Sequence, residues 1–231
     1  MTSKSERLKF LICEQVESTI SGLFPYTRVL PFGSTVNSFG KNNSDLDMAI
    51  THQEHAKKKS SRLVFHTKGS GLRNTGQSDN KLLMSYLSFA LKSFVPGCQD
   101  VTNIFHARVP IIKFKQDFMD IECDVSTSSS GYYMRYDYKM VSLVAMITIY
   151  LILFFSNLLY IWGHTDWRVR PLAFAIRKWA DEHNLIGSTR PTTYFTNFPL
   201  TLLIVFYLQC QHKILPSLNQ LNKLAGKLLK S

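Results

Sequence analysis

The 231 residues can form one large domain or two small ones, and a composition with 45% hydrophobic and 19% charged residues excludes disorder as the default state. Lysine and arginine outnumber aspartate and glutamate by 27 to 16, so the formal net charge is +11. This balance favours a polyanionic partner, although basic side chains also serve as ordinary solvated surface.

The first predicted elements are one helix and two strands. Apolar residues at helical spacing predict a helix over residues 3–23 that ends at Gly22. Hydrophobic runs then predict strands at 29–32 and 46–50. The two strands enclose a short polar loop, which is where the candidate chemistry lies.

Two carboxylates follow a glycine turn in this region. Gly33-Ser34 comes directly after the first strand, and Asp45 and Asp47 lie two apart at the start of the second. Side chains two apart on a strand point to the same face, and two carboxylates held side by side repel each other unless they share cations. The pattern therefore suggests a magnesium-dependent site that handles phosphates.

A third carboxylate can reach the same site from a later strand. Residues 52–80 predict a long mobile loop around one short strand at 62–66, and helical periodicity follows at 82–94. Apolar and acidic residues then alternate in the last of three further predicted strands, which cover residues 101–108, 111–115 and 120–125. The spacing alone leaves Asp120, Glu122 and Asp124 as equal candidates, and an exposed acidic strand is the alternative.

The second half of the chain predicts helices. An uncharged apolar segment covers residues 140–162 and, at about 1.5 Å per residue, is long enough to cross the hydrocarbon core of a bilayer. On hydropathy alone this segment favours a membrane helix over a buried core helix. Three more helices are predicted at 168–183, 197–209 and 218–229. The fold class is therefore α+β, with a mixed unit followed by a helical one.

The cysteines and histidines show no metal-ligand or disulfide spacing. The four cysteines are far apart and include no Cys-x-x-Cys pair, which favours reduced thiols. The polar stretch Met1–Lys9 resembles neither a secretory signal nor a transit peptide, so we expect any targeting sequence to lie outside this chain.

The run from Pro31 to Gly40, followed by Ser44-Asp45-Leu46-Asp47, resembles the active-site signature of the DNA-polymerase-beta-like nucleotidyltransferases. Within that superfamily the chain most resembles the mitochondrial poly(A) polymerases of animals. Further stretches support the resemblance in the expected order over most of the chain, at residues 107–114, 123–126, 158–163, 166–183 and 196–209.

The resemblance implies a palm-like mixed sheet and template-independent addition of nucleotides, normally AMP from ATP, to an RNA 3′ end. ATP and an RNA 3′ end are thus the expected partners, and Mg²⁺ or Mn²⁺ is the expected cofactor. Asp45 and Asp47 would hold two metal ions, and Asp124 would complete the metal site and help to activate the attacking 3′-hydroxyl. Gly33 and Ser34, at an expected helix start, would cradle the triphosphate.

The helical unit supplies the other nucleotide contacts that the resemblance implies. Arg177 matches a basic residue that reaches the triphosphate, Asn197 a small polar residue near the phosphates, and Phe198 an aromatic residue that stacks on the base. The alternatives are a surface cation for Arg177 and a core aromatic for Phe198. Asp181 stands where the similar enzymes have a basic residue, which weakens the expectation of a full triphosphate clamp.

The resemblance divides the chain into a nucleotidyltransferase catalytic domain (1–130), an apolar insert (131–157) and a partial helical central domain (158–231). About twenty residues, 136–155, have no counterpart in the similar enzymes. A membrane anchor, an extension of the following helix and a translated intron or other gene-model artefact are the three explanations. We favour the artefact, and membrane attachment is not expected, because a span between two halves of one active site would separate them.

We expect the helical domain to be incomplete at Ser231, with the dimerising N-terminal region of the similar enzymes also missing, so a homodimer would form only through regions outside this chain. The resemblance implies a mitochondrial location. Three other functions stay open: a terminal uridylyltransferase, a non-catalytic RNA-binding fragment and a membrane-anchored fragment.

Overall fold

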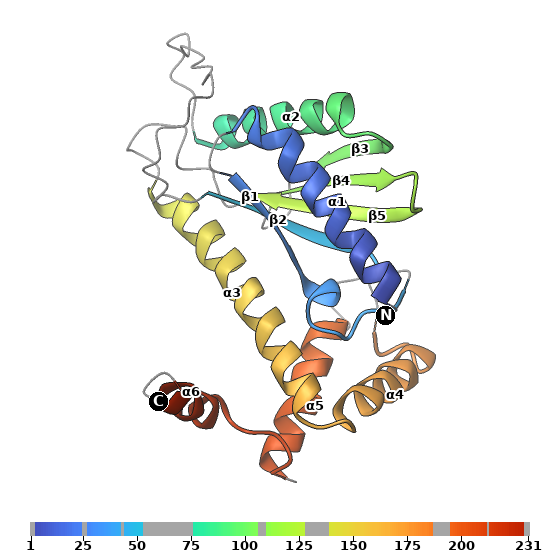
Figure 1. The fold of residues 1–231 in the computed structure, drawn as a ribbon, viewed down its shortest axis with the longest axis vertical. Helices are drawn as coiled ribbons and strands as arrows, with labels where there is room; N and C mark the ends of the chain where they lie inside the picture. Colours follow the sequence, from blue (N-terminus) through green and yellow to red (C-terminus); the bar gives the residue numbers. More distant parts are fainter. Residues whose placement is uncertain are drawn as a thin grey trace. The chain divides into compact units, whose positions relative to one another are not determined.

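The computed structural model describes eight stretches of the chain, which belong to two compact units (Figure 1). The first unit comprises residues 1–36 and 40–156, and the second comprises residues 37–39 and 157–231. The described residues are 3–24, 27–42, 44–52, 76–105, 110–127, 139–186, 195–211 and 213–228.

A five-stranded mixed sheet forms the centre of the first unit, which confirms the predicted α+β class. The strand order is β1-β2-β5-β4-β3, in which only β2 and β5 run parallel. Neighbours β2 and β5 are far apart in the chain, so the sheet brings the aspartates of both strands together. The strands are β1 (Thr27–Phe32), β2 (Leu46–His52), β3 (Cys98–Ile104), β4 (Ile111–Gln116) and β5 (Ile121–Thr127).

Helices α1 (Ser3–Ser21) and α2 (Gly76–Phe94) pack against each other and against the sheet (Figure 1). The buried stripe of α1 includes Ile12, Val16 and Ile20, each at most 1% exposed. Burying a side chain of this size stabilises the fold by roughly 1.5–3 kcal/mol relative to leaving it in water. Because strand residues alternate between faces, the apolar residues of β2 and β5 face this core and the aspartates between them face away.

The second unit is helical. Its elements are the end of α3 (Lys139–Thr165), α4 (Val169–Glu182), α5 (Asn197–Cys210) and α6 (Leu218–Leu228). Phe39 belongs to this unit and is 2% exposed, with its ring 6.5 Å from the Phe174 ring. A Cβ on Gly163 would lie 3.1 Å from the Phe39 ring, a tight contact that would require the ring to shift by a few tenths of an ångström.

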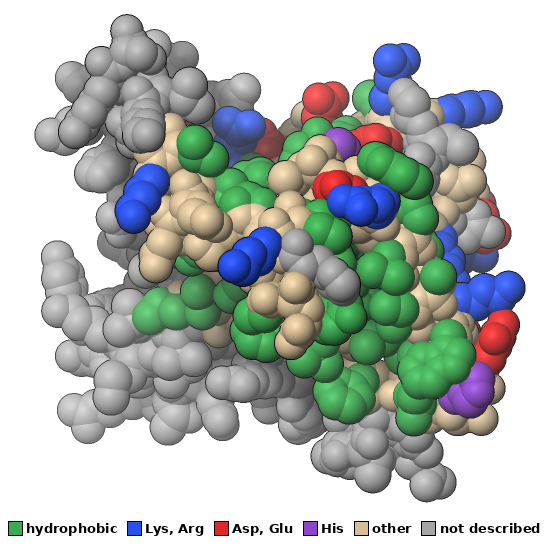
Figure 2. Space-filling model, turned by 90° about the horizontal axis from the view of Figure 1, so that it is seen from below, with side chains coloured by type: hydrophobic (Ala, Val, Ile, Leu, Met, Phe, Trp, Pro, Cys, Tyr) green, Lys and Arg blue, Asp and Glu red, His purple; other side chains and the backbone are tan. Residues whose placement is uncertain are grey.

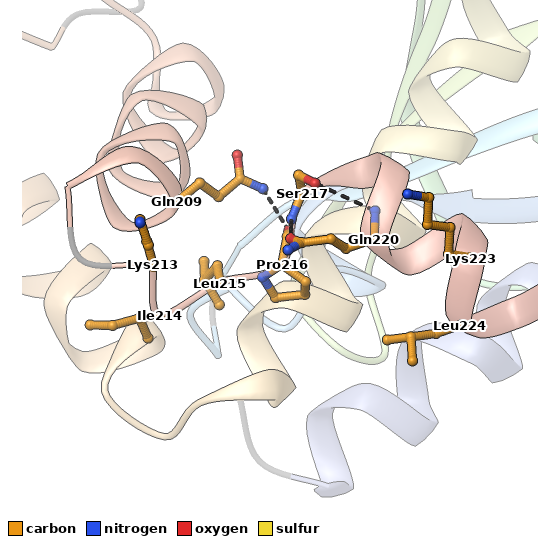
Figure 3. A pocket seen from close by; sticks show the side chains of 9 residues that line it. All are labelled: Gln209, Lys213, Ile214, Leu215, Pro216, Ser217, Gln220, Lys223 and Leu224. Atoms are coloured by element: carbon orange, nitrogen blue, oxygen red, sulfur yellow. Dashed lines mark hydrogen bonds between the residues drawn. The ribbon is translucent and has the colours of Figure 1, made fainter.

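Several large hydrophobic side chains of the second unit are exposed, and Figure 2 shows hydrophobic side chains gathered on one face beside a few lysines and arginines. A hollow of about 790 Å³ also opens between α5 and α6 (Figure 3). None of the predicted site residues lines it. Its lining includes Lys213 and Lys223, and the Gln209 side chain donates to the Pro216 carbonyl there.

Two sequence-based boundaries are wrong. Helix α2 begins at Gly76, inside the stretch predicted as loop, because its first turn is polar and carries no apolar stripe. Strand β3 starts three residues early, at Cys98. Trp179 shares the helical spacing of the apolar residues in α4 but is 51% exposed, because the buried stripe is narrow and made of Val169, Ala173 and Ala180. The predicted strand at 62–66 lies outside the described residues.

The apolar segment 140–162 forms most of α3, which runs without a break from the first unit into the second. Ile147–Thr165 is long and apolar enough to cross a membrane, by length and composition only. Ser156 in this helix donates to the Ile152 carbonyl and accepts from the Gly33 amide at 2.9 Å, a contact within the first unit. This is the arrangement that the helix-extension alternative describes, while the origin of the insert stays a hypothesis.

Candidate nucleotide and metal site

The parallel pairing of β2 and β5 places two predicted metal ligands side by side. Asp47 and Asp124 are direct partners in the register of the two strands. Burial, together with the charges of Asp124 and Asp45, raises the pKa of Asp47 to about 6. The two carboxylates thus form an electrostatically unfavourable pair on one face of the sheet.

A lysine on the next strand partly offsets this charge. Lys113 in β4 lies opposite Asp124 in the antiparallel register, and its Nζ is 2.8 Å from Asp124 Oδ2. The hydrogen bond to Asp124 raises the pKa of Lys113. The other oxygen, Asp124 Oδ1, is buried and has no hydrogen-bond partner among the described residues. An unpartnered carboxylate oxygen in such a position is available to a cation.

The donor set fits a hard divalent cation only in part. Asp47 and Asp124 are paired, whereas Asp45 is exposed just before β2. In the described part of the chain, no group of three or more His, Cys, Asp and Glu side chains is close enough to hold a metal. The unpartnered Oδ1 of Asp124 and the raised pKa of Asp47 are both features that a shared cation would relieve. The three-ligand assignment stays a prediction.

Gly33 brings the backbone against this pair of carboxylates. Its φ is +64°, a conformation that favours glycine, and an added Cβ would lie 2.7 Å from Asp47 Oδ2. The predicted helix start is a short 3-10 turn over Gly33–Thr35, and Ser34 Oγ donates to Ser44 Oγ at 3.1 Å. The Gly33 backbone therefore lies directly against the Asp47 carboxylate, as a phosphate site beside a metal site requires.

A buried lysine that sequence reasoning missed holds the loop before β2. Lys9 in α1 is fully buried, and its Nζ donates to the Ser44 carbonyl at 2.6 Å and to Ser44 Oγ at 2.9 Å. Burial lowers its pKa, against the opposing effect of the nearby aspartates. The available signal was its place on the buried stripe of α1, three residues before Ile12 and seven before Val16.

In the second unit the structure joins two of the predicted nucleotide contacts. Arg177 Nε donates to Asn197 Oδ1 and Arg177 Nη1 donates to the Phe39 carbonyl, both at 2.9 Å. The guanidinium also lies 5.7 Å from the Phe174 ring centroid, and burial lowers its pKa. Arg177 is therefore a half-buried, fixed group and not a surface cation. Phe198 is 44% exposed, so it is not a core aromatic.

This combination of a mixed sheet, a glycine turn and adjacent carboxylates on parallel strands defines a nucleotidyltransferase palm, as the sequence predicted. Residues 1–131 match the family model described as the central palm domain of mitochondrial-like poly(A) RNA polymerases. The chain belongs to this family.

Curated relatives agree with this assignment. The chain is 38% identical to the mitochondrial poly(A) RNA polymerase of Drosophila melanogaster over 95% of its own length and 33% of that protein. It is 34% identical to the Homo sapiens protein of the same name over 97% of its own length and 36% of that protein. The chain thus spans about a third of the length of these relatives.

Solved structures agree as well. The crystal structure of mtPAP in complex with ATPgammaS superposes with a TM-score of 0.72 at 33% identity, over 97% of this chain and 42% of that chain. The structure of mtPAP in complex with UTP has the same TM-score at 32% identity, over 97% of this chain and 43% of that chain.

Proposed function

We propose that this chain carries the palm of an RNA 3′-end adenylyltransferase, which adds AMP from ATP to RNA. The observation that carries the proposal is the register of Asp47 with Asp124 beside the Gly33 turn. The relatives named poly(A) RNA polymerase support it, and one similar structure contains ATPgammaS.

The residues of the first unit divide the chemistry between them. Asp45, Asp47 and Asp124 would hold Mg²⁺ or Mn²⁺, which supplies charge neutralisation for phosphoryl transfer when bound. Lys113 holds the Asp124 side chain through their 2.8 Å ion pair, and the Asp124 carboxylate would accept the proton of an attacking 3′-hydroxyl. The Gly33-Ser34 turn would direct its backbone and hydroxyl towards the triphosphate.

The residues of the second unit would recognise the nucleotide. Arg177 would reach the triphosphate, Asn197 would lie near the phosphates, and Phe198 would stack on the base. The bond from Arg177 to Asn197 supports the first two roles, because it holds the guanidinium in one orientation before a phosphate binds. The 44% exposure of Phe198 supports the third, since base stacking needs an aromatic side chain at the surface.

Extension of a short RNA by the purified chain tests the proposal. With Mg²⁺ and each nucleoside triphosphate in turn, we expect extension with ATP alone. Extension with UTP alone would instead favour a uridylyltransferase, and no extension with any triphosphate would favour a non-catalytic fragment.

Two variants test the residue roles in the same assay. Asp47→Asn and Asp124→Asn should reduce extension by about a hundredfold or more while RNA binding is retained. Asp120→Asn is the matched control, because Asp120 is an exposed acid in the turn before β5, paired only with Lys115 among the described residues. Retained activity in Asp47→Asn or Asp124→Asn would contradict the assignment.

We also propose a mitochondrial location for the full protein. The names of the relatives support it, because the family includes mitochondrial poly(A) RNA polymerases. Fractionation of cells that express a tagged full-length protein tests it. Recovery in the cytosolic fraction alone would contradict it.

A further inference from the structure

A fully buried lysine without a carboxylate partner is unusual, and Lys9 forms no ion pair with a carboxylate of the described residues. Removing a charge from water costs free energy unless hydrogen bonds replace the lost hydration. Lys9 Nζ contacts three oxygens of one short loop: the Ser44 carbonyl, Ser44 Oγ and, at 3.5 Å, the Asp45 carbonyl. The hydrogen bonds of its ammonium group therefore hold the loop at Ser44 and Asp45 in place. This loop leads directly into β2, the strand that carries Asp47.

The same face of α1 holds the loop at a second point. Ser5 lies four residues before Lys9, so the two side chains share one helix face. Ser5 Oγ donates to the Asn42 carbonyl at 3.1 Å. Two contacts from one helix thus hold the last residues before β2 at Asn42 and at Ser44, which a helix that served only as a core element would not need.

The loop links Lys9 to the serine predicted to bind phosphate. Ser44 Oγ accepts from Lys9 Nζ and from Ser34 Oγ, which lies 3.1 Å away. Gly40 makes room for this arrangement, because a Cβ there would lie 2.5 Å from the Ser34 carbonyl and 3.2 Å from Ser44 Oγ. The three polar groups form one connected chain, which runs from the buried ammonium to the edge of the site.

We propose that Lys9 is a positioning residue for nucleotide binding: it fixes Ser44, and Ser44 orients the Ser34 hydroxyl towards a phosphate oxygen of the nucleotide. A hydroxyl has one proton and two lone pairs, so the hydrogen bond between the serines can reverse. Ser44, held as an acceptor by Lys9, then donates to Ser34, and the Ser34 proton turns to the phosphate. This inference rests on the proposed function, because it takes the Gly33-Ser34 turn as the phosphate site.

Lys9→Met and Ser44→Ala test this relay, the chain of hydrogen bonds from Lys9 through Ser44 to Ser34. Methionine matches the length of the lysine side chain without its charge, and a buried apolar residue is not expected to unfold the protein. Equilibrium titration with ATP in the presence of Mg²⁺ should show roughly tenfold weaker binding in each variant, with the melting temperature unchanged or raised in Lys9→Met. The double variant should be little weaker than either single one, because both changes break the same chain.

Lys4→Met is the matched control, since Lys4 is an exposed lysine on the same helix, and it should bind ATP like the unchanged protein. Should Lys9→Met fail to fold, Ser44→Ala carries the test, because it leaves the Lys9 contacts to both backbone carbonyls in place. ATP affinity equal to that of Lys4→Met in Ser44→Ala, or in a folded Lys9→Met, would overturn the inference.

ATP binding and RNA extension are measured separately so that the two proposals can fail separately. If the unchanged chain extends RNA and both variants bind ATP normally, the proposed function is supported and the relay is overturned. If the unchanged chain binds ATP but extends no RNA, the proposed function is overturned. Weaker ATP binding in both variants would then still support the relay. A chain that binds no ATP overturns the relay.

Discussion

The candidate groups of the two units are held in different ways. In the first unit the backbone sets their positions: Asp47 and Asp124 are adjacent because β2 and β5 are in register, and Gly33 approaches them through a left-handed φ. In the second unit side chains do this work, since Arg177 is fixed by Asn197 and by the Phe39 carbonyl. The carboxylates therefore depend on the integrity of the sheet, whereas the basic group depends on a few individual hydrogen bonds.

The difference follows from the charges involved. Two carboxylates repel, so side-chain contacts alone would not hold them together, and a sheet register does so whatever their charge. A guanidinium finds neutral acceptors easily, so a helix surface and one loop carbonyl are sufficient to hold it. Substitutions should accordingly act through backbone conformation in the first unit and through single hydrogen bonds in the second.

The largest effect is expected at Gly33. Gly33→Ala forces an alanine into a φ of +64° and puts its Cβ 2.7 Å from Asp47 Oδ2, so the carboxylate must move. We expect a loss of about 1–3 kcal/mol in the free energy of unfolding. Displacement of a catalytic group should also lower RNA extension by about a hundredfold. Denaturant unfolding and the extension assay measure the two effects.

Gly22→Ala is the control, because its φ lies outside the left-handed region and the nearest atom to an added Cβ is 3.8 Å away. It should leave both quantities unchanged. Full activity in Gly33→Ala would mean that the backbone at Gly33 does not set the position of the carboxylate.

Arg177→Lys should give a smaller effect, confined to nucleotide affinity. Lysine keeps the charge but lacks the planar fork that donates to Asn197 and to the Phe39 carbonyl together. We expect roughly tenfold weaker ATP binding in titration, because hydrogen bonds from a charged group are lost. Arg168→Lys is the control in the segment before α4, where an exposed ion pair with Asp166 contributes little. Equal affinity in the two variants would contradict the assigned role of Arg177.

Local patterns predicted the first unit well. Alternation in β5 correctly placed Asp124 on the face opposite Ile121 and Cys123, and the spacing of Asp45 and Asp47 pointed to a site beside Gly33. Side chains along a strand alternate between its two faces. The positions of the apolar residues within a few neighbouring positions therefore predict which face is buried.

Contacts between distant residues were not predictable in the same way. Lys9 reads as one more polar residue of a charged helix, and its burial depends on Ser44, 35 positions away. Trp179 fits a helical stripe by spacing, yet the surface that α4 covers accommodates only Val169 and two alanines fully. Which apolar residue of a helix is buried depends on its neighbours in space, which periodicity does not report.

Trp162→Phe tests the role of a single side-chain hydrogen bond in the second unit through the free energy of unfolding. The indole Nε1 donates to the Pro216 carbonyl at 2.9 Å, and the side chain is 6% exposed. The carbonyl keeps a second donor, Gln209 Nε2, so the loss should be modest, about 1–2 kcal/mol in the free energy of unfolding. Trp167→Phe, at an 81% exposed position, should cost nothing measurable in the same denaturant titration. A larger loss in Trp167→Phe than in Trp162→Phe would contradict this account of the second unit.

The smallest expected effect is a difference in cysteine reactivity between the two units, which can be measured without any substitution. Burial raises the pKa of Cys13 to about 12 and that of Cys98 to about 11, and it also raises the pKa of Cys123, so the thiols of the first unit stay protonated and unreactive. Cys210 in α5 is exposed. Iodoacetamide at neutral pH, followed by mass spectrometry, should label Cys210 first in the native protein and all the cysteines in denaturant. Rapid native labelling of Cys13 would mean that the core beneath α1 opens readily, and the sheet would then be too mobile to hold the two carboxylates in register.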